Sequence, residues 1–372
     1  MNSLPHSTTL PVQKLSSIFE DTSASYKFLL FKAIFDSVRE GKCELQFDDL
    51  AIRAISQAWY SIHFYKLNYG HSDRMTRWVR ELDIALSDNI LISNLSYSKI
   101  YEVLTELRSG EISHEGVGAY LEKYIREFQK LVPYRLITPW FKNELRGKKD
   151  SVKNSLICEL SARDEFQSLY SIDNSGNYLC LFIRETWASY LNSKLSIIEG
   201  WWKYNFILYL QKNNPTVLSI STKLDPPISR NNSKVAKLYK EYYLKTGIDK
   251  TCFYSGEKLD SISHDHFLPW SFLGSDPIYN FVPSSKSVNC SKSNILPAKK
   301  YLENFSKFQY SIFNYLLKYN QKSTALESFI SDLHLDKEMP FDVFSQKIEA
   351  FYNPLFLTAE NQGFSLDWSF TS

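Results

Sequence analysis

One stretch in the last third of the chain holds side chains whose types and spacing could do chemistry together. An Asp265–His266 pair is followed by Asn280, fourteen residues after the histidine, and by Asn289 nine residues further on. Lys292 stands three residues beyond Asn289. An imidazole can accept a proton from water near neutral pH, and carboxylate and amide oxygens are ligands for a hard cation. The set therefore suits hydrolysis of a phosphodiester by a water activated beside a divalent ion.

Each of these residues can be given a task from its position on two strands and a helix. Successive side chains of a strand alternate between faces, so Asp265 could hold the metal while His266 addresses the water. The carbonyl of Asn280, on the opposite strand, could accept the other ring N–H of His266 and fix its tautomer. Asn289, at the start of the next helix, would be a second oxygen ligand to Mg²⁺ or Mn²⁺. Lys292 lies on the same helix face and could pair with a phosphate.

The segment from Cys252 to Pro297 resembles an HNH endonuclease of the ββα-metal type, in the subtype whose triad reads Asp-His, Asn, Asn. The resemblance rests on the blocks DHFLPWSF, YNFVP and VNCSKSN, which align with that family's strand, strand and helix. The spacing is similar to that of the HNH domain in RNA-guided CRISPR effector nucleases. The resemblance implies metal ligation by Asp265 and Asn289, base catalysis by His266, orientation by Asn280, and products with 5′ phosphate and 3′ hydroxyl ends.

One departure from the family concerns a structural zinc that many members hold with two Cys pairs. The corresponding positions here are Cys252, Ser255, Ser285 and Val288, so three of the four ligands are missing. A tetrahedral zinc knot cannot form from these residues. We therefore expect one catalytic ion and no structural zinc, with the hairpin held by packing of Phe253, Phe267, Leu268, Trp270, Phe272 and Phe281.

The local charge balance around this segment favours a polyanionic substrate. Residues 230–307 contain twelve Lys and Arg against seven Asp and Glu, while the whole chain has a net charge of only +2. The candidates for contact with a nucleic acid backbone are Lys286, Lys292, Lys299 and Lys300. A solvated basic face is the alternative interpretation.

These residues predict a metal-dependent endonuclease, and the family resemblance implies DNA as its substrate, with RNA not excluded, and a role in bacterial restriction or phage defence. The defence role is an association with the family rather than a physical inference. Three alternatives remain open: a nuclease subunit of a larger CRISPR-type or other defence complex with protein partners, a mobile-element nuclease, and a non-catalytic HNH module that only binds nucleic acid.

Composition places the chain among soluble globular proteins in a reducing compartment. It has 372 residues, of which 44% are hydrophobic, and its five Cys are scattered without a CxxC pair. This pattern indicates a cytoplasmic protein. The polar start of the chain lacks a secretion signal, and the apolar run Tyr26–Val38 is too short to span a bilayer. We therefore expect no membrane association.

Hydrophobic periodicity predicts a mainly α protein with an embedded ββα-metal hairpin. A second, small β-hairpin is expected between Phe166 and Phe182, around the turn sequence IDNSGN. The expected domains are a helical body at 1–225 for recognition or partner docking, a linker and basic helix at 226–247, the HNH unit at 248–300 and a helical extension at 301–372. Helices are predicted at Val12–Phe19, Ser25–Glu40, Phe47–Gly70, Asp73–Ile90, Ser96–Ser109, Glu115–Leu131, Ile183–Leu195, Ile197–Gln211, Lys234–Lys245, Ala298–Lys318, Ser323–Leu333 and Phe341–Phe351.

Aromatic residues make up 15% of the chain and fall at helical spacings in the N-terminal body, for example Trp59, Trp201 and Trp202. They could form a stacking surface for unpaired bases, but core filling is the favoured interpretation. The aromatic C-terminal end, FSLDWSFTS, is expected to dock rather than hang free.

Overall fold

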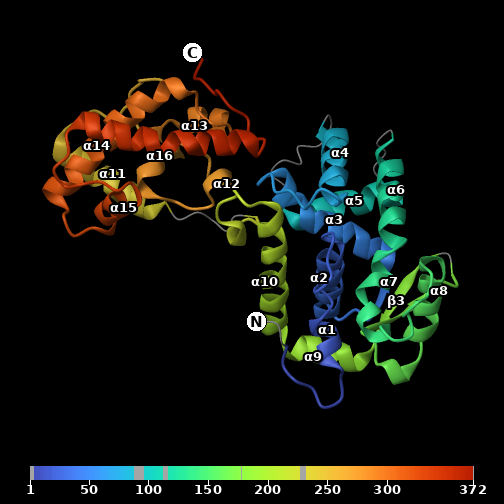
Figure 1. The fold of residues 1–372 in the computed structure, drawn as a ribbon. Coiled ribbons are helices and arrows are strands. Elements are labelled where there is room, and N and C mark those ends of the chain that lie inside the picture. Colours follow the sequence, from blue (N-terminus) through green and yellow to red (C-terminus); the bar gives the residue numbers. More distant parts are fainter. Residues whose placement is uncertain (1–3, 88–95, 112–115, 177, 227–231, 372) are drawn as a thin grey trace. The chain divides into compact units, whose positions relative to one another are not determined.

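The structure is a computed structural model that describes residues 4–87, 96–111, 116–176, 178–226 and 232–371 (Figure 1). It divides into two compact units. The N-terminal unit is Met1–Pro215 with Leu224–Pro226, and the C-terminal unit is Thr216–Lys223 with Pro227–Ser372. The boundary expected near residue 225 falls where the chain passes between the units. Residues 88–90 and 115 of two predicted helices, and 227–231 of the predicted linker, lie outside the described residues.

The N-terminal unit is a helical body whose central helix, α2 (Tyr26–Arg39), is buried on most of its faces. Its predicted apolar face of Phe28, Phe31, Ile34, Phe35 and Val38 is at most 1% exposed. The helices α7 (Val132–Leu136) and α8 (Asp150–Ser161) were not predicted, and α7 overlaps the sequence PYRLITPW, which interrupts the helical pattern. The other helices are α1 (Val12–Ser16), α3 (Phe47–His63), α4 (Met75–Ser87), α5 (Tyr97–Ser109), α6 (Val117–Gln129), α7 (Val132–Leu136), α8 (Asp150–Ser161), α9 (Glu185–Ser193) and α10 (Leu195–Asn213).

A small antiparallel sheet completes this unit and confirms the predicted hairpin. Strand β2 (Tyr170–Asp173) pairs with β3 (Cys180–Ile183). A third strand, β1 (Glu44–Gln46), was not predicted, and it pairs with the other edge of β3 so that the order is β1-β3-β2. Three residues are too few to show the alternation of apolar and polar side chains that predicts a strand. The pairing of Leu45 with Leu181, both buried, is evident only in the structure.

Aromatic side chains of the N-terminal unit form its core, as the favoured interpretation held. Trp59 is 1% exposed, and Trp201 and Trp202 are also buried. The indole N–H of Trp202 donates to the carbonyl of Phe28 at 2.8 Å, so its polar atom is satisfied inside the unit. A base-stacking surface at these residues is therefore ruled out.

The C-terminal unit has one hydrophobic core shared by the hairpin and all of its longer helices. The basic helix α11 and the C-terminal helices thus pack with the hairpin into one body. In chain order the elements are α11 (Ser233–Thr246), β4 (Ser263–His266), α12 (Trp270–Leu273), the 3₁₀ turn η5 (Ile278–Asn280), β5 (Phe281–Ser284), α13 (Lys286–Lys292), the 3₁₀ turn η6 (Lys299–Tyr301), α14 (Leu302–Tyr319), α15 (Thr324–Asp332) and α16 (Phe341–Asn361).

The C-terminal end differs from the prediction in helix length but not in docking. Helix α16 continues through Pro354 to Asn361, because Phe356 and Ala359 remain buried beyond the proline. After the helix, the tail lies beside residues 296–298: Leu296 N–H donates to the Ser365 carbonyl and Trp368 N–H donates to the Leu296 carbonyl, both at 2.9 Å. Among the described residues, no helix is long and apolar enough to cross a membrane.

Candidate active site

The candidate site is built on the antiparallel pair β4–β5 and the helix α13 that follows it. Asp265 faces Val282 across the pair, and His266 faces Phe281. The carbonyl of Phe281 accepts hydrogen bonds from the Tyr239 hydroxyl of α11 at 2.7 Å and from the Gln309 amide of α14 at 2.8 Å. These buried bonds fix β5 to two helices, so strands of only four residues hold a defined register.

Three of the predicted site residues come together around one polar cavity. Asp265, His266 and Asn289 all line it, and its volume is about 330 Å³. The side-chain amide nitrogen of Asn289 donates to Ser263 Oγ at 2.8 Å. The side-chain oxygen of Asn289 is therefore the atom that could bind a ligand. The spacing in the sequence was thus sufficient to select residues that share a site.

Asp265 is a buried carboxylate that already has two partners. It is 4% exposed, and its Oδ2 accepts a hydrogen bond from the Tyr254 hydroxyl at 2.7 Å. The Lys292 ammonium lies 3.0 Å from the same oxygen and also donates to the His266 carbonyl at 2.7 Å. The negative charge of Asp265 is therefore balanced inside the protein.

This arrangement corrects the expected role of Lys292. Its side chain is fully buried, so it cannot contact a phosphate backbone as predicted. Burial lowers the pKa of Lys292, whereas the charge and hydrogen bond of Asp265 raise it. Helical spacing placed the lysine on the face of Asn289, but only packing shows that this face points inward.

His266 is held by a carboxylate that the sequence did not single out. Its Nε2 lies 2.6 Å from Oδ1 of Asp276, and its ring centroid lies 4.2 Å from that of Phe281. The His266 side chain is 7% exposed, whereas Asp276 is 40% exposed. Asp276 stands in the loop sequence GSDP. Acidic residues are common in turns, so the local sequence gave no indication that Asp276 contacts the histidine.

Asn280 lies in the turn η5 just before β5 rather than on the strand. Its side-chain oxygen accepts from Leu268 N–H at 3.0 Å, and its side-chain nitrogen donates to the Leu268 carbonyl at 2.9 Å. Its main-chain carbonyl accepts from Phe267 N–H at 2.7 Å. Asn280 therefore fixes the chain immediately after His266, a task that differs from the predicted contact with the imidazole ring.

Asn232 and His264 are among the further residues that line the cavity. Asn232 precedes α11, and its side-chain oxygen is buried without a hydrogen-bond partner in the described part of the chain. The Asn232 side chain makes no capping bond to α11. His264 also lines the cavity, and burial lowers the pKa of its imidazole. An unsatisfied buried oxygen is the kind of atom that a ligand or ion would satisfy.

A loop on the other side of the site depends on one glycine. Gly274 ends α12 with φ of 70°, and a Cβ there would lie 2.9 Å from the Thr222 side chain. The close approach lets the Lys223 ammonium, which is fully buried, donate to the Phe272 carbonyl at 2.5 Å. Residues 216–223 are thereby attached to α12, the helix that follows β4.

Main-chain hydrogen bonds fix the turn that begins at Cys252. Cys252 N–H donates to the Glu257 carbonyl at 2.7 Å, and Gly256 N–H donates to the Cys252 carbonyl at 2.8 Å. Phe267 stacks on Phe305 with ring centroids 3.9 Å apart, in line with the packing expected of it. Throughout the described residues, no group of three or more His, Cys, Asp and Glu could hold a metal ion.

Two antiparallel strands followed by a helix, with Asp, His and Asn around one polar cavity, define a ββα site of the nuclease type. Residues 252–298 match the family model described as HNH endonuclease, so the chain contains an HNH endonuclease domain. No curated protein and no solved structure is significantly similar to the chain. The domain implies a nucleic acid substrate, and nucleases of this family generally use a divalent metal ion.

Proposed function

We propose that the protein is a divalent-metal-dependent endonuclease that hydrolyses phosphodiester bonds in DNA. The observation that carries the proposal is the shared polar cavity of Asp265, His266 and Asn289 within the HNH domain. A carboxylate, an imidazole and an amide oxygen around one cavity provide the groups for metal-assisted hydrolysis. The family resemblance favours DNA over RNA as the substrate. A cleavage assay with each of the two substrates tests this preference.

The oxygen atoms at the cavity fit one Mg²⁺ or Mn²⁺ ion. Asp265 offers a carboxylate, Asn289 offers the oxygen opposite its bonded nitrogen, and Asn232 offers a buried oxygen that has no partner among the described residues. A hard cation that keeps several waters suits such a set of few oxygen ligands. When bound, the ion would neutralise charge on the phosphate. The Lys292 ammonium would continue to share Asp265 with it.

His266 is proposed as the general base, with Asp276 as the residue that positions it. An ionised Asp276 accepts a hydrogen bond from Nε2–H, and this fixes the tautomer in which Nδ1 is unprotonated. Nδ1 then takes the proton from the attacking water, and the adjacent carboxylate stabilises the resulting imidazolium. Asn280 supports the same geometry through the Leu268 backbone.

Lys286, Lys299 and Lys300 are the proposed contacts to the nucleic acid backbone. All three are exposed, in contrast to Lys292, and they lie on α13 and the turn η6 that follows it. Contacts of this kind would add salt-dependent affinity without sequence preference. Replacing all three with Gln should weaken DNA binding and make its salt dependence shallower.

We place the protein in the cytoplasm and propose a role in restriction or phage defence. Unpaired side chains at all five cysteines agree with a reducing compartment. The defence role follows from the association of HNH nucleases with such systems. Phage plating on cells that carry either the wild type or His266→Ala tests it: equal plaque numbers would contradict the defence role.

Plasmid cleavage tests the enzymatic proposal directly. Wild type with Mg²⁺ should cut, whereas His266→Ala should be slower by about 10²- to 10⁴-fold and EDTA should abolish cutting. His334→Asn is the matched control, since His334 is exposed with φ of 51°, which Asn tolerates. If wild type and His266→Ala behave alike, the protein is not a nuclease of this mechanism.

A further inference from the structure

The N-terminal unit contains a cavity of about 660 Å³ that the nuclease chemistry does not use. Its lining comes from the start of α2 and from the segment between α6 and α8, two parts of the chain more than a hundred residues apart. The volume falls within the range of about 300–1,000 Å³ that small-molecule sites occupy. The cavity lies wholly within the N-terminal unit.

Five cations line this cavity against one carboxylate, that of Asp21. The cations are Lys27, Arg135, Lys142, Arg146 and Lys153. Asp150, outside the lining, lies 2.7 Å from Lys153 and 3.7 Å from Arg135. Over the described ranges, Lys142 and Arg146 have no ion pair. The lining therefore carries an excess of positive charge that the unit does not balance.

The electrostatic effect of this excess is visible at Lys27. Burial lowers the pKa of Lys27, the Asp21 charge raises it, and the positive charges of Arg135 and Lys142 lower it further. The Lys27 ammonium donates to the Asp21 main-chain carbonyl at 2.8 Å, which contributes no negative charge. Cations that repel one another in a partly desolvated cavity favour an anionic ligand.

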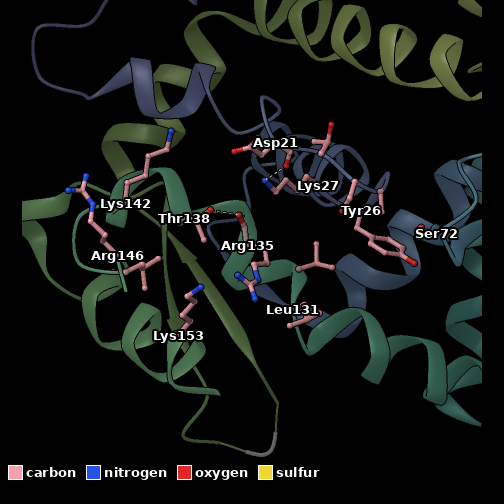
Figure 2. Close-up of a pocket in the computed structure, with 15 residues that line it drawn as sticks. Asp21, Tyr26, Lys27, Ser72, Leu131, Arg135, Thr138, Lys142, Arg146 and Lys153 are labelled. Carbon is pink, nitrogen blue, oxygen red and sulfur yellow. Dashed lines mark hydrogen bonds between the residues drawn. The ribbon is translucent and has the colours of Figure 1, made fainter. Parts of the chain in front are cut away.

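The cavity also has an apolar end. Tyr26 is half-buried with its ring 5.7 Å from Trp78, and Leu131 is 52% exposed. In Figure 2, Lys142 and Arg146 lie on the opposite side of the cavity from Tyr26 and Leu131. A ligand spanning the cavity would thus meet Lys142 and Arg146 on one side, and on the other the side chains of Tyr26 and Leu131 with Lys27 and Arg135 beside them.

We propose that this cavity binds a phosphorylated small molecule of nucleotide size. Arg and Lys pair with the phosphates, because planar guanidinium groups and ammonium groups make charge-assisted hydrogen bonds to phosphate oxygens. Tyr26 and Leu131 cover the base. A duplex fits less well, since its backbone is contacted across a broad surface rather than within a concave pocket of this volume.

Calorimetric titration of the full-length protein with ATP, adenosine and pyrophosphate tests this site. ATP should bind more tightly than either fragment. The double variant Lys142→Gln/Arg146→Gln should lose at least about tenfold in ATP affinity, since two charge-assisted contacts are removed. The control Lys123→Gln/Lys212→Gln removes the same charge from exposed positions outside the cavity and should stay within about twofold.

Three results would overturn the proposal. The first is no binding of ATP or pyrophosphate at millimolar concentration. The second is equal ATP affinity in the two double variants. The third is a short DNA duplex that binds when ATP does not and is weakened by the cavity variant, which would make this a nucleic acid contact. DNA cleavage does not enter the measurement, so failure of the nuclease proposal would leave this result unaffected.

Discussion

The two cavities of this protein use charge in opposite ways. In the HNH domain, Asp265 and Lys292 are buried and paired with each other, and the cavity is lined by this carboxylate together with amides and imidazoles. In the N-terminal cavity, Lys142 and Arg146 are exposed and have no ion pair among the residues described. A paired buried charge holds a geometry, whereas an unpaired exposed charge is available to a ligand. The HNH cavity is therefore suited to positioning reacting groups, and the N-terminal cavity is suited to attracting an anion.

Removing Lys292 should have the largest effect on stability. Lys292→Met leaves the Asp265 carboxylate buried without its cation, and breaking such a pair costs about 3–5 kcal/mol of unfolding free energy. Chemical denaturation measures this loss, and Mn²⁺ should restore part of it by binding the native state. Lys142→Gln is the matched control and should change stability by less than about 0.5 kcal/mol. Similar losses of unfolding free energy in both variants would contradict the distinction between a paired buried lysine and an unpaired exposed one.

Replacing Asn280 should have the next largest effect on stability, because its side chain forms hydrogen bonds with two backbone groups. Asn280→Ala leaves the buried N–H and carbonyl of Leu268 without partners, at a cost of about 1–3 kcal/mol for each group. The variant should unfold more easily, and hydrogen exchange at Leu268 should speed up. An activity loss without any change in stability would instead support the predicted contact between Asn280 and the His266 ring.

Asp276 should affect the reaction rather than the fold. Asp276→Asn replaces the carboxylate by a neutral amide that can donate as well as accept, so the His266 tautomer is no longer fixed and the cleavage rate should fall. Because Asp276 is 40% exposed, unfolding should change little. The pH–rate profile is the informative readout, because a change in the partner of the imidazole should alter it, whereas a purely structural role of Asp276 would not. An unchanged profile would mean that Asp276 does not act on the imidazole.

Lys223 should produce a smaller effect that depends on pH. Burial lowers the pKa of Lys223 to about 7, against 10.5 for an ordinary lysine. Between these values the unfolded chain binds more protons than the folded one, so stability should rise with pH. Below pH 7 both states are protonated and the burial cost is constant. We expect a gain of roughly 1–2 kcal/mol from pH 7 to 9. Lys223→Met should abolish this gain. An equal dependence of the unfolding free energy on pH in the wild type and in Lys223→Met would contradict the lowered pKa of Lys223.

Sequence alone predicted the segment that carries the candidate site, because the chemistry demands particular residue types at particular separations. The Asp265–His266 pair, Asn280 and Asn289 were selected this way, and the strands and helix around them follow the predicted order. The buried apolar face of α2 was equally predictable, since helical periodicity is a local property. These features need no knowledge of distant parts of the chain.

Tertiary structure decided which side chains face inward and what each one touches. Lys292 has the spacing of a phosphate contact, but packing turns it onto Asp265. Asp276 and Asn232 reach the site from a turn and from the start of a helix, where polar residues carry no local signal. The cationic cavity joins α2 to residues more than a hundred positions later. Burial and long-range contact depend on the whole fold, whereas residue type and spacing are written directly in the chain.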